Sequence, residues 1–273
     1  MKVIIMAVTL NTSLGNSLAI SGQNTSNDSF QKLASGSKIN SASDNAAGLA
    51  VAEKLTSKLG GFDAAIRNAN DSISAIQVAD GALESLNTNV ARIQELTLQA
   101  GNGALNSQDR QALQAEADQL ISESNRLLEN TNFNGKSLLN TEEGVSVQLD
   151  EPGNAIQLEG KNLAEAFNDL GFNDIDLTSQ SAANESLEIL NSASELVLSR
   201  QSELGAVSNR IESSISTMSE SKLNTAEARS RISDADFAKV AADLAASQVR
   251  DQAQIAVQGQ ANAQQSAVLQ LLS

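Results

Sequence analysis

The chain has 273 residues, a formal net charge of −15, 2% aromatic residues, and neither histidine nor cysteine. It therefore lacks the commonest metal ligands, the usual general base at neutral pH, thiol nucleophiles and disulfides, so we expect no enzyme activity and no cofactor. The acidic excess argues against a nucleic-acid partner, which needs clustered Lys and Arg. No run of about 18 apolar residues is present, so we expect no membrane insertion.

The first predicted element is a polar, weakly helical segment at residues 7–34, in which Leu10, Leu14 and Leu18 recur every four residues. It carries too little apolar surface to be stable alone. The opening residues lack the extended apolar core and cleavage site of a secretory signal peptide.

A much longer helix is predicted from about residue 44 to 100, with Ser43 or Asp44 as its N-terminal cap. Its apolar residues keep a three-four spacing with one phase slip near Ala79: Leu55, Leu59, Phe62, Ile66, Ala69, Ile73, Ile76, Leu83, Leu86, Val90 and Ile93. Such a seam faces a partner helix. At about 1.5 Å per residue the helix would be roughly 85 Å long, which predicts a rod.

Residues 101–106 predict a break, after which Ser107 and Asp109 are expected to begin a shorter helix that carries Leu113, Ala117, Leu120, Ser124 and Leu127. A turn is predicted at residues 132–135. Residues 145–149 and 155–159 alternate apolar and polar side chains around Pro152 and Gly153, which predicts a β-hairpin. Asn173, Asp174 and Asp176 carry the oxygen ligands that Ca²⁺ prefers, but they lack the twelve-residue pattern of an EF-hand loop, and we interpret them as a solvated acidic turn.

The helical pattern returns near Asn184, and a second seam runs through Leu187, Leu190, Ser194, Val197, Gln201, Leu204, Ser208, Ile211, Ile215 and Met218. The final tract is rich in Ala and Gln and ends in Val268, Leu269, Leu271 and Leu272. The predicted fold class is mainly α: a long antiparallel helical rod or coiled-coil bundle built from both chain ends, with a small β-containing central insertion.

The chain contains a series of distinctive motifs: SGSKINSASDNAAGLA (35–50), RNANDSIS (67–74), QVADGAL (77–83), NVARIQELTLQA (89–100), QAEADQL (114–120), TNFNGKSLL (131–139), RQSELGAVSNRI (200–211), ARSRISDADFA (228–238) and VLQLLS (268–273). These motifs resemble those of one protein family, the bacterial flagellins. They occur in the family's order over about four fifths of the chain. The family's usual start aligns with Met6, so residues 1–5 resemble an extension.

The resemblance implies a secreted subunit that polymerises into the extracellular flagellar filament for swimming. Residues 1–43 and 230–273 would be terminal helices of the inner filament core, 44–140 and 180–229 the long-helix rod domain, and 141–179 a short, acidic, exposed insertion. Two other roles stay open: a hook–filament junction protein of the same superfamily, and a cell-surface adhesin or ligand receptor on the same scaffold.

The resemblance also implies partners. These are identical or sister flagellins, the flagellar export apparatus and a secretion chaperone, the filament cap, and hook-junction proteins. Arg92, Leu96 and Glu116 match positions at which a vertebrate Toll-like receptor recognises many flagellins, and they are otherwise expected on the solvent side of two packed helices. Leu10, Leu14 and Leu18, with Val268, Leu269, Leu271 and Leu272, are the candidate polymerisation and chaperone-binding residues.

Overall fold

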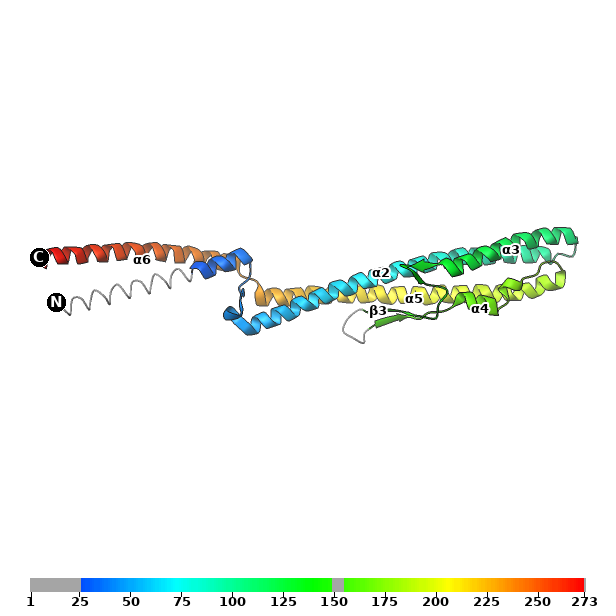
Figure 1. Cartoon of the computed structure of the whole chain (residues 1–273), viewed down its shortest axis with the longest axis horizontal. Coiled ribbons are helices and arrows are strands. Elements are labelled where there is room, and N and C mark those ends of the chain that lie inside the picture. Colours follow the sequence, from blue (N-terminus) through cyan, green and yellow to red (C-terminus); the bar gives the residue numbers. More distant parts are fainter. Residues whose placement is uncertain (1–25, 149–154, 273) are drawn as a thin grey trace. The chain divides into compact units, whose positions relative to one another are not determined.

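The computed structural model describes residues 26–148 and 155–272, and the described chain is mainly helical (Figure 1). A helix at residues 26–35 is followed by α2 (Ala42–Ala100), α3 (Ser107–Asn130), α4 (Leu163–Asp169), α5 (Gln180–Ser233) and α6 (Phe237–Leu272). In sequence order, the long helix α2 precedes a small strand-containing insertion, and the long helices α5 and α6 follow it. The mainly α fold class predicted from the sequence is confirmed.

The chain divides into two compact units. A central unit comprises residues 60–222, and a terminal unit comprises residues 1–59 and 223–273. Both α2 and α5 contribute residues to each unit. These limits differ from the boundaries at 43 and 230 suggested by the family resemblance, so those boundaries stay an expectation.

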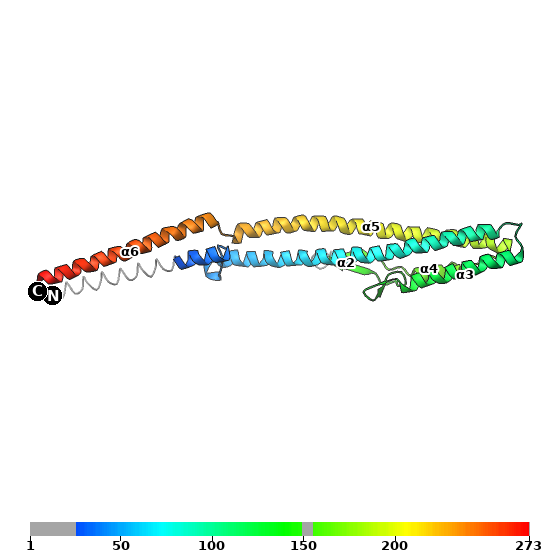
Figure 2. The ribbon, with the colours of Figure 1, turned by 90° about the horizontal axis from the view of Figure 1, so that it is seen from above.

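The central unit holds the apolar core. Every residue of the main buried cluster lies between Phe62 and Met218, and α2 and α5 together supply most of it, in part through their predicted seams. Figures 1 and 2 show the two helices side by side within this unit. Gln94 donates to Asn191 at 3.3 Å and Lys222 pairs with Asp63, so the helices are antiparallel.

The turn between α2 and α3 is fixed by side chains at its two ends. Asn106 caps α3 by accepting the amides of Gln108 and Asp109, and the Asp109 carboxylate accepts the amide of Asn106 in return. The predicted start at Ser107 is confirmed, but the capping side chain is Asn106. Arg110 donates to the carbonyls of Ala100, Asn102 and Leu105 at 2.9–3.0 Å, which satisfies the last carbonyl of α2 and two carbonyls of the turn.

Two short hairpins follow α3. In the first, β1 (Asn132–Phe133) pairs with β2 (Lys136–Ser137), and Asn134 and Gly135 both have positive φ, as a type I′ turn requires. In the second, β3 (Val145–Gln148) pairs antiparallel with β4 (Ala155–Leu158), which confirms the predicted hairpin. Its predicted turn residues Pro152 and Gly153 lie outside the described residues.

The insertion also contains a helix that the sequence analysis did not predict. In α4, Leu163 and Phe167 are fully buried. The Phe167 ring packs edge to face against the ring of Phe172 in the 3₁₀ turn η1 (Phe172–Asp174), with 4.9 Å between the two ring centroids. The Gln114 side-chain amide then bonds the backbone on both sides of Asp176, accepting from the Leu177 amide at 2.6 Å and donating to the Ile175 carbonyl at 3.0 Å. This contact holds the segment that leads into α5 against α3. The helix α5 begins at Gln180, four residues before the predicted Asn184.

In the terminal unit, the segment after residue 35 pairs with the segment between α5 and α6. Lys38 donates its amide to the Ser233 carbonyl at 2.7 Å, and Ala235 donates to the Gly36 carbonyl at 2.9 Å. Gly36 has φ +69, a conformation that other residues rarely adopt.

The cap of α2 differs from the prediction. Asn45 is extended (φ −166, ψ 95), and its side chain accepts the Gly48 amide at 2.8 Å, so Asn45 begins the regular helix. The Asp44 carboxylate accepts the amides of Asn40 and Ser41 instead, and these bonds lower the pKa of Asp44 below its ordinary value. The expectation that Ser43 or Asp44 is the cap is wrong, because the preceding turn uses the Asp44 carboxylate.

Candidate functional site

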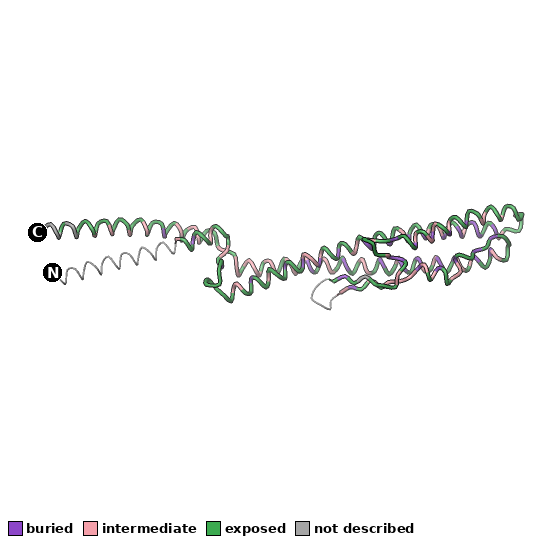
Figure 3. Tube along the Cα trace, viewed as in Figure 1, coloured by how far each residue is buried: buried purple, intermediate pink, exposed green. Residues whose placement is uncertain are grey.

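The 36-residue helix α6 exposes large apolar side chains that the described residues of the chain leave uncovered. Val249 is 66% exposed, Val257 68% and Ile255 74%. Among the side chains that the structure describes on α6, Ser247 is buried and no apolar side chain is. Figure 3 shows the contrast with the central unit, where buried positions follow the facing sides of α2 and α5.

One face of α6 is less exposed, and it is largely polar. Its residues follow a three-four spacing: Val240, Leu244, Ser247, Asp251, Gln254, Gln258 and Ala261. Ser26, from the helix at residues 26–35, lies 2.9 Å from the Ser247 hydroxyl and donates to the Asp251 carboxylate at 3.2 Å. Hydroxyl contacts of this kind fix the register of two helices but contribute little hydrophobic stabilisation.

The opposite face of α6 is exposed and largely apolar. Its residues are two positions beyond those of the polar face and keep the same spacing: Ala242, Ala246, Val249, Ala253, Ala256 and Gln260. At about 100° per residue, this offset places the row on the other side of the helix. An exposed apolar row on a helix of this length is typical of a surface that another helix covers.

The two candidate tail segments lie largely outside the described residues. Leu10, Leu14 and Leu18 are not described. The backbone of Val268, Leu269, Leu271 and Leu272 belongs to α6, but their side chains are not described. Their roles therefore stay a prediction.

The three candidate receptor contacts lie in the central unit, and two of them touch. Arg92 donates to Glu116 through two nitrogens at 2.8 and 3.0 Å and to Glu95 at 2.9 Å, and its bond to Glu116 raises the pKa of the Arg92 guanidinium. Leu96 is only 2% exposed and belongs to the buried core. The expectation of a solvent-side position is therefore right for Arg92 and Glu116 and wrong for Leu96, because its side chain lies on the seam side of α2.

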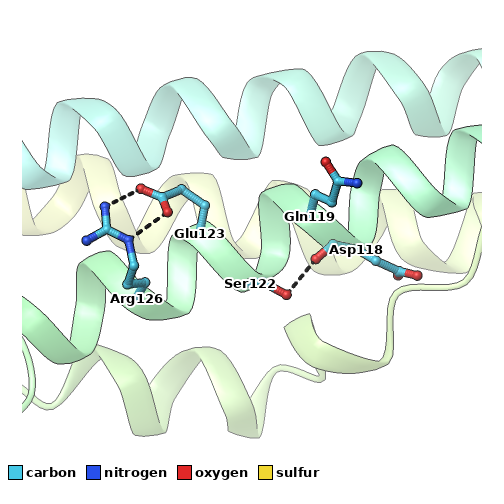
Figure 4. Close-up of a pocket in the computed structure, with 5 residues that line it drawn as sticks. All are labelled: Asp118, Gln119, Ser122, Glu123 and Arg126. Atoms are coloured by element: carbon cyan, nitrogen blue, oxygen red, sulfur yellow. Dashed lines mark hydrogen bonds and ion pairs between the residues drawn. The ribbon is translucent and has the colours of Figure 1, made fainter.

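A shallow hollow of about 370 Å³ lies on α3. Figure 4 shows its lining residues, among which Arg126 pairs with Glu123 through two nitrogens at 2.6 and 2.7 Å. This pair lowers the pKa of Glu123 and raises that of Arg126. In the part of the chain that the structure describes, no group of three potential metal ligands occurs, and none of the helices there combines the length and the apolar composition of a membrane span.

Sequence reasoning missed one buried cation that ties the insertion to α5. Arg200 is 3% exposed, donates to the Glu159 carbonyl at 2.9 Å, and pairs with Glu203 at 3.1 Å. Lys161 also pairs with Glu203 at 3.0 Å, and these two cations lower the pKa of that carboxyl, with the Lys161 bond the larger cause. The sequence did contain one signal of this buried cation, because Arg200 lies between the apolar seam residues Val197 and Leu204.

Comparisons with known proteins match one protein family along most of the chain. Residues 6–143 match the bacterial flagellin N-terminal helical region, and residues 187–272 match the bacterial flagellin C-terminal helical region. A flagellin of Halalkalibacterium halodurans is 36% identical over 245 residues, which cover 89% of this chain and 90% of that protein. A flagellin of Bacillus subtilis is 33% identical over 290 residues, with 92% and 94% covered.

Two solved structures have a similar fold. The crystal structure of Bacillus cereus flagellin has a TM-score of 0.51 and 25% identity, and the match covers 56% of this chain and 88% of that chain. A putative flagellar hook-associated protein from Vibrio parahaemolyticus has a TM-score of 0.60 and 16% identity, with 70% and 100% covered. At that identity, the second likeness shows the fold alone.

Proposed function

Because the chain belongs to the bacterial flagellin family and is a structural subunit of the flagellar filament, we propose that polymerisation supplies apolar partners to the exposed side chains of α6. One observation carries this mechanism. The main apolar core lies wholly between Phe62 and Met218, while α6 leaves Val249, Ile255 and Val257 two-thirds or more exposed. Stacking α6 against α6 helices of neighbouring copies buries this surface and favours the polymer.

The role is structural and not enzymatic, and the assembled protein lies outside the cell as a filament that drives swimming. In this proposal residues 1–43 and 230–273 form the inner part of the filament, the long helices form the next layer, and residues 141–179 face the medium. Nine acidic residues occur between residues 140 and 180 against the single base Lys161, which suits a solvated position.

The proposed partners follow from assembly outside the cell. The subunit copolymerises with identical or sister flagellins, passes through the flagellar export apparatus with a secretion chaperone, and meets the filament cap and the hook-junction proteins. The candidate tails, Leu10 to Leu18 and Val268 to Leu272, would bind the chaperone first and neighbouring subunits later. A junction protein or an adhesin is not favoured, because the flagellin relatives match about nine tenths of the chain.

We also propose that Arg92 and Glu116 form a contact surface for the vertebrate Toll-like receptor for flagellin. Their paired, half-exposed side chains support this assignment. Leu96 would act from the core by holding α2 in place beneath them. Arg92→Ala and Glu116→Ala should each lower receptor activation by the monomer, and unchanged activation by both variants would remove the proposal.

A truncation tests the assembly mechanism. Deleting the residues after Val249 removes half of the exposed row of α6, together with the exposed Ile255 and Val257, and leaves the central unit intact. We expect a soluble protein that unfolds cooperatively by circular dichroism and forms no filaments when seeds are added. Normal filaments of the truncated protein in electron micrographs would contradict the mechanism.

A further inference from the structure

The central unit has a groove of about 520 Å³ between α4 and α5. Leu170 and Leu196 supply part of its apolar lining, and Asp169 and Glu195 bring carboxylates to it. Both carboxylates are exposed, and among the described residues neither has a Lys or Arg within ion-pair distance. The lining therefore suits a segment that presents an aliphatic side chain beside a cation.

A filament subunit needs two different surfaces that fit each other. A contact between unlike surfaces can repeat without closing and produces an open helical polymer, whereas a contact between like surfaces closes as a dimer. The groove supplies one surface of such a pair. Its complement on a second copy must be an exposed apolar residue with a cation on the same helix face.

One turn of α2 meets this requirement. The exposed large apolar side chains of the described chain are Phe30, Val51, Val78, Leu98, Leu198, Leu223, Phe237, Val249, Ile255 and Val257. Residues three or four positions apart share a helix face. Of this set, only Val51 has a Lys or Arg at such a distance, namely Lys54. Val51 is 47% exposed, and Lys54 is exposed.

We propose that the groove between α4 and α5 of one subunit receives the Val51–Lys54 turn of a second copy. Val51 packs against Leu170 and Leu196, and the Lys54 ammonium lies between Asp169 and Glu195. The contact places a cation where the groove has two uncompensated carboxylates, so it contributes both affinity and orientation. This inference rests on the proposed function, because the polymer supplies the second copy.

Charge reversal with rescue tests the contact in the full-length chain. Glu195→Lys should raise the critical concentration for seeded polymerisation roughly three- to tenfold at low salt, and by less at high salt. Lys54→Glu should do the same. Because each subunit carries both surfaces, the double variant should return to within about twofold of the wild type.

A matched control is Glu188→Lys, which makes the same charge change at an exposed position of α5 outside the groove. It should leave the critical concentration unchanged, and circular dichroism should show equal thermal unfolding for all variants.

If Glu195→Lys behaves like Glu188→Lys, or if Lys54→Glu does not restore it, the contact is wrong even though the wild type forms filaments. A wild-type chain that fails to polymerise would count against the proposed function and the contact together.

Discussion

The exposed side chains of α6 allow a substitution that separates assembly from folding. Ile255 is 74% exposed in the single chain, so replacing it by Gln removes almost no buried contact. Gln is also a slightly better helix former than Ile. We therefore expect the free energy of unfolding of the monomer to change by less than about 0.5 kcal/mol.

Assembly should respond much more strongly. Full burial of an aliphatic side chain of this size contributes about 1.5–3 kcal/mol. Because Ile255 is 74% exposed in the single chain, roughly three quarters of this free energy can still be gained when a neighbouring subunit buries the side chain. The expected loss is about 1–2 kcal/mol per subunit contact. Because each 1.4 kcal/mol corresponds to a factor of ten, the critical concentration should rise roughly 5- to 30-fold.

The assay is sedimentation of seeded filaments over a range of subunit concentrations, beside thermal unfolding of the monomer by circular dichroism. Leu204→Ala is the matched control, because Leu204 is 1% exposed in the core of the central unit. It should cost the monomer about 2–5 kcal/mol. The reasoning is refuted if Ile255→Gln polymerises at the wild-type concentration, or if it destabilises the monomer as much as Leu204→Ala does.

Three further predictions concern the fold. A Cβ at Gly48 would lie 2.7 Å from Ile39 Cδ1, so Gly48→Ala should lower the melting temperature although Ala favours helix; Gly60→Ala, where a Cβ meets nothing within 4 Å, should raise it instead. Gln114→Glu replaces the amide that donates to the Ile175 carbonyl by an acceptor, and it should cost about 1–3 kcal/mol in denaturant unfolding, with Gln119→Glu on the exposed side of α3 as a near-neutral control. Glu203 has a lowered pKa in the folded chain, because Lys161 and Arg200 bond its carboxylate. Its contribution to stability is therefore complete above the ordinary glutamate pKa of about 4.3 and is lost as the pH falls from there through the lowered pKa. The melting-temperature difference between the wild type and Glu203→Gln should be present at pH 7 and shrink progressively below about pH 4.3, and a difference that stays constant across this acid range would contradict this assignment.

The long helices were predictable because their signal is long. The three-four spacing on α2 continues from Leu55 to Ile93, and a helical period over so many residues is hard to mistake for another structure. The second hairpin was equally accessible, since two alternating segments flank Pro152 and Gly153.

Other features have no such signal. With seven residues, α4 is too short for a period to show, and its place depends on Phe167 packing against Phe172. The pairing of Gly36 and Lys38 with Ala235 and Ser233 joins residues almost 200 positions apart through two backbone bonds, and local sequence does not encode it. Capping by Asn45 was missed because three neighbouring residues can all cap a helix, and only the turn decides which one does.

The candidate site was predictable in outline. Scattered apolar residues at the C-terminal end indicated a helix that is marginal by itself, but the division of α6 into a polar face and an exposed apolar face became visible only with the partner at Ser26. Leu96 was placed on the wrong side of α2, because a family resemblance does not tell which of two adjacent faces a leucine occupies.

Amide hydrogen exchange of α6, followed by mass spectrometry in the monomer and in the filament, tests the central claim most directly. The account predicts rapid exchange of the backbone amides between Ala242 and Gln260 in the monomer and strong protection of the same amides in the filament, with the core amides of the central unit protected in both. Equal, strong protection of this stretch in the isolated monomer would contradict it.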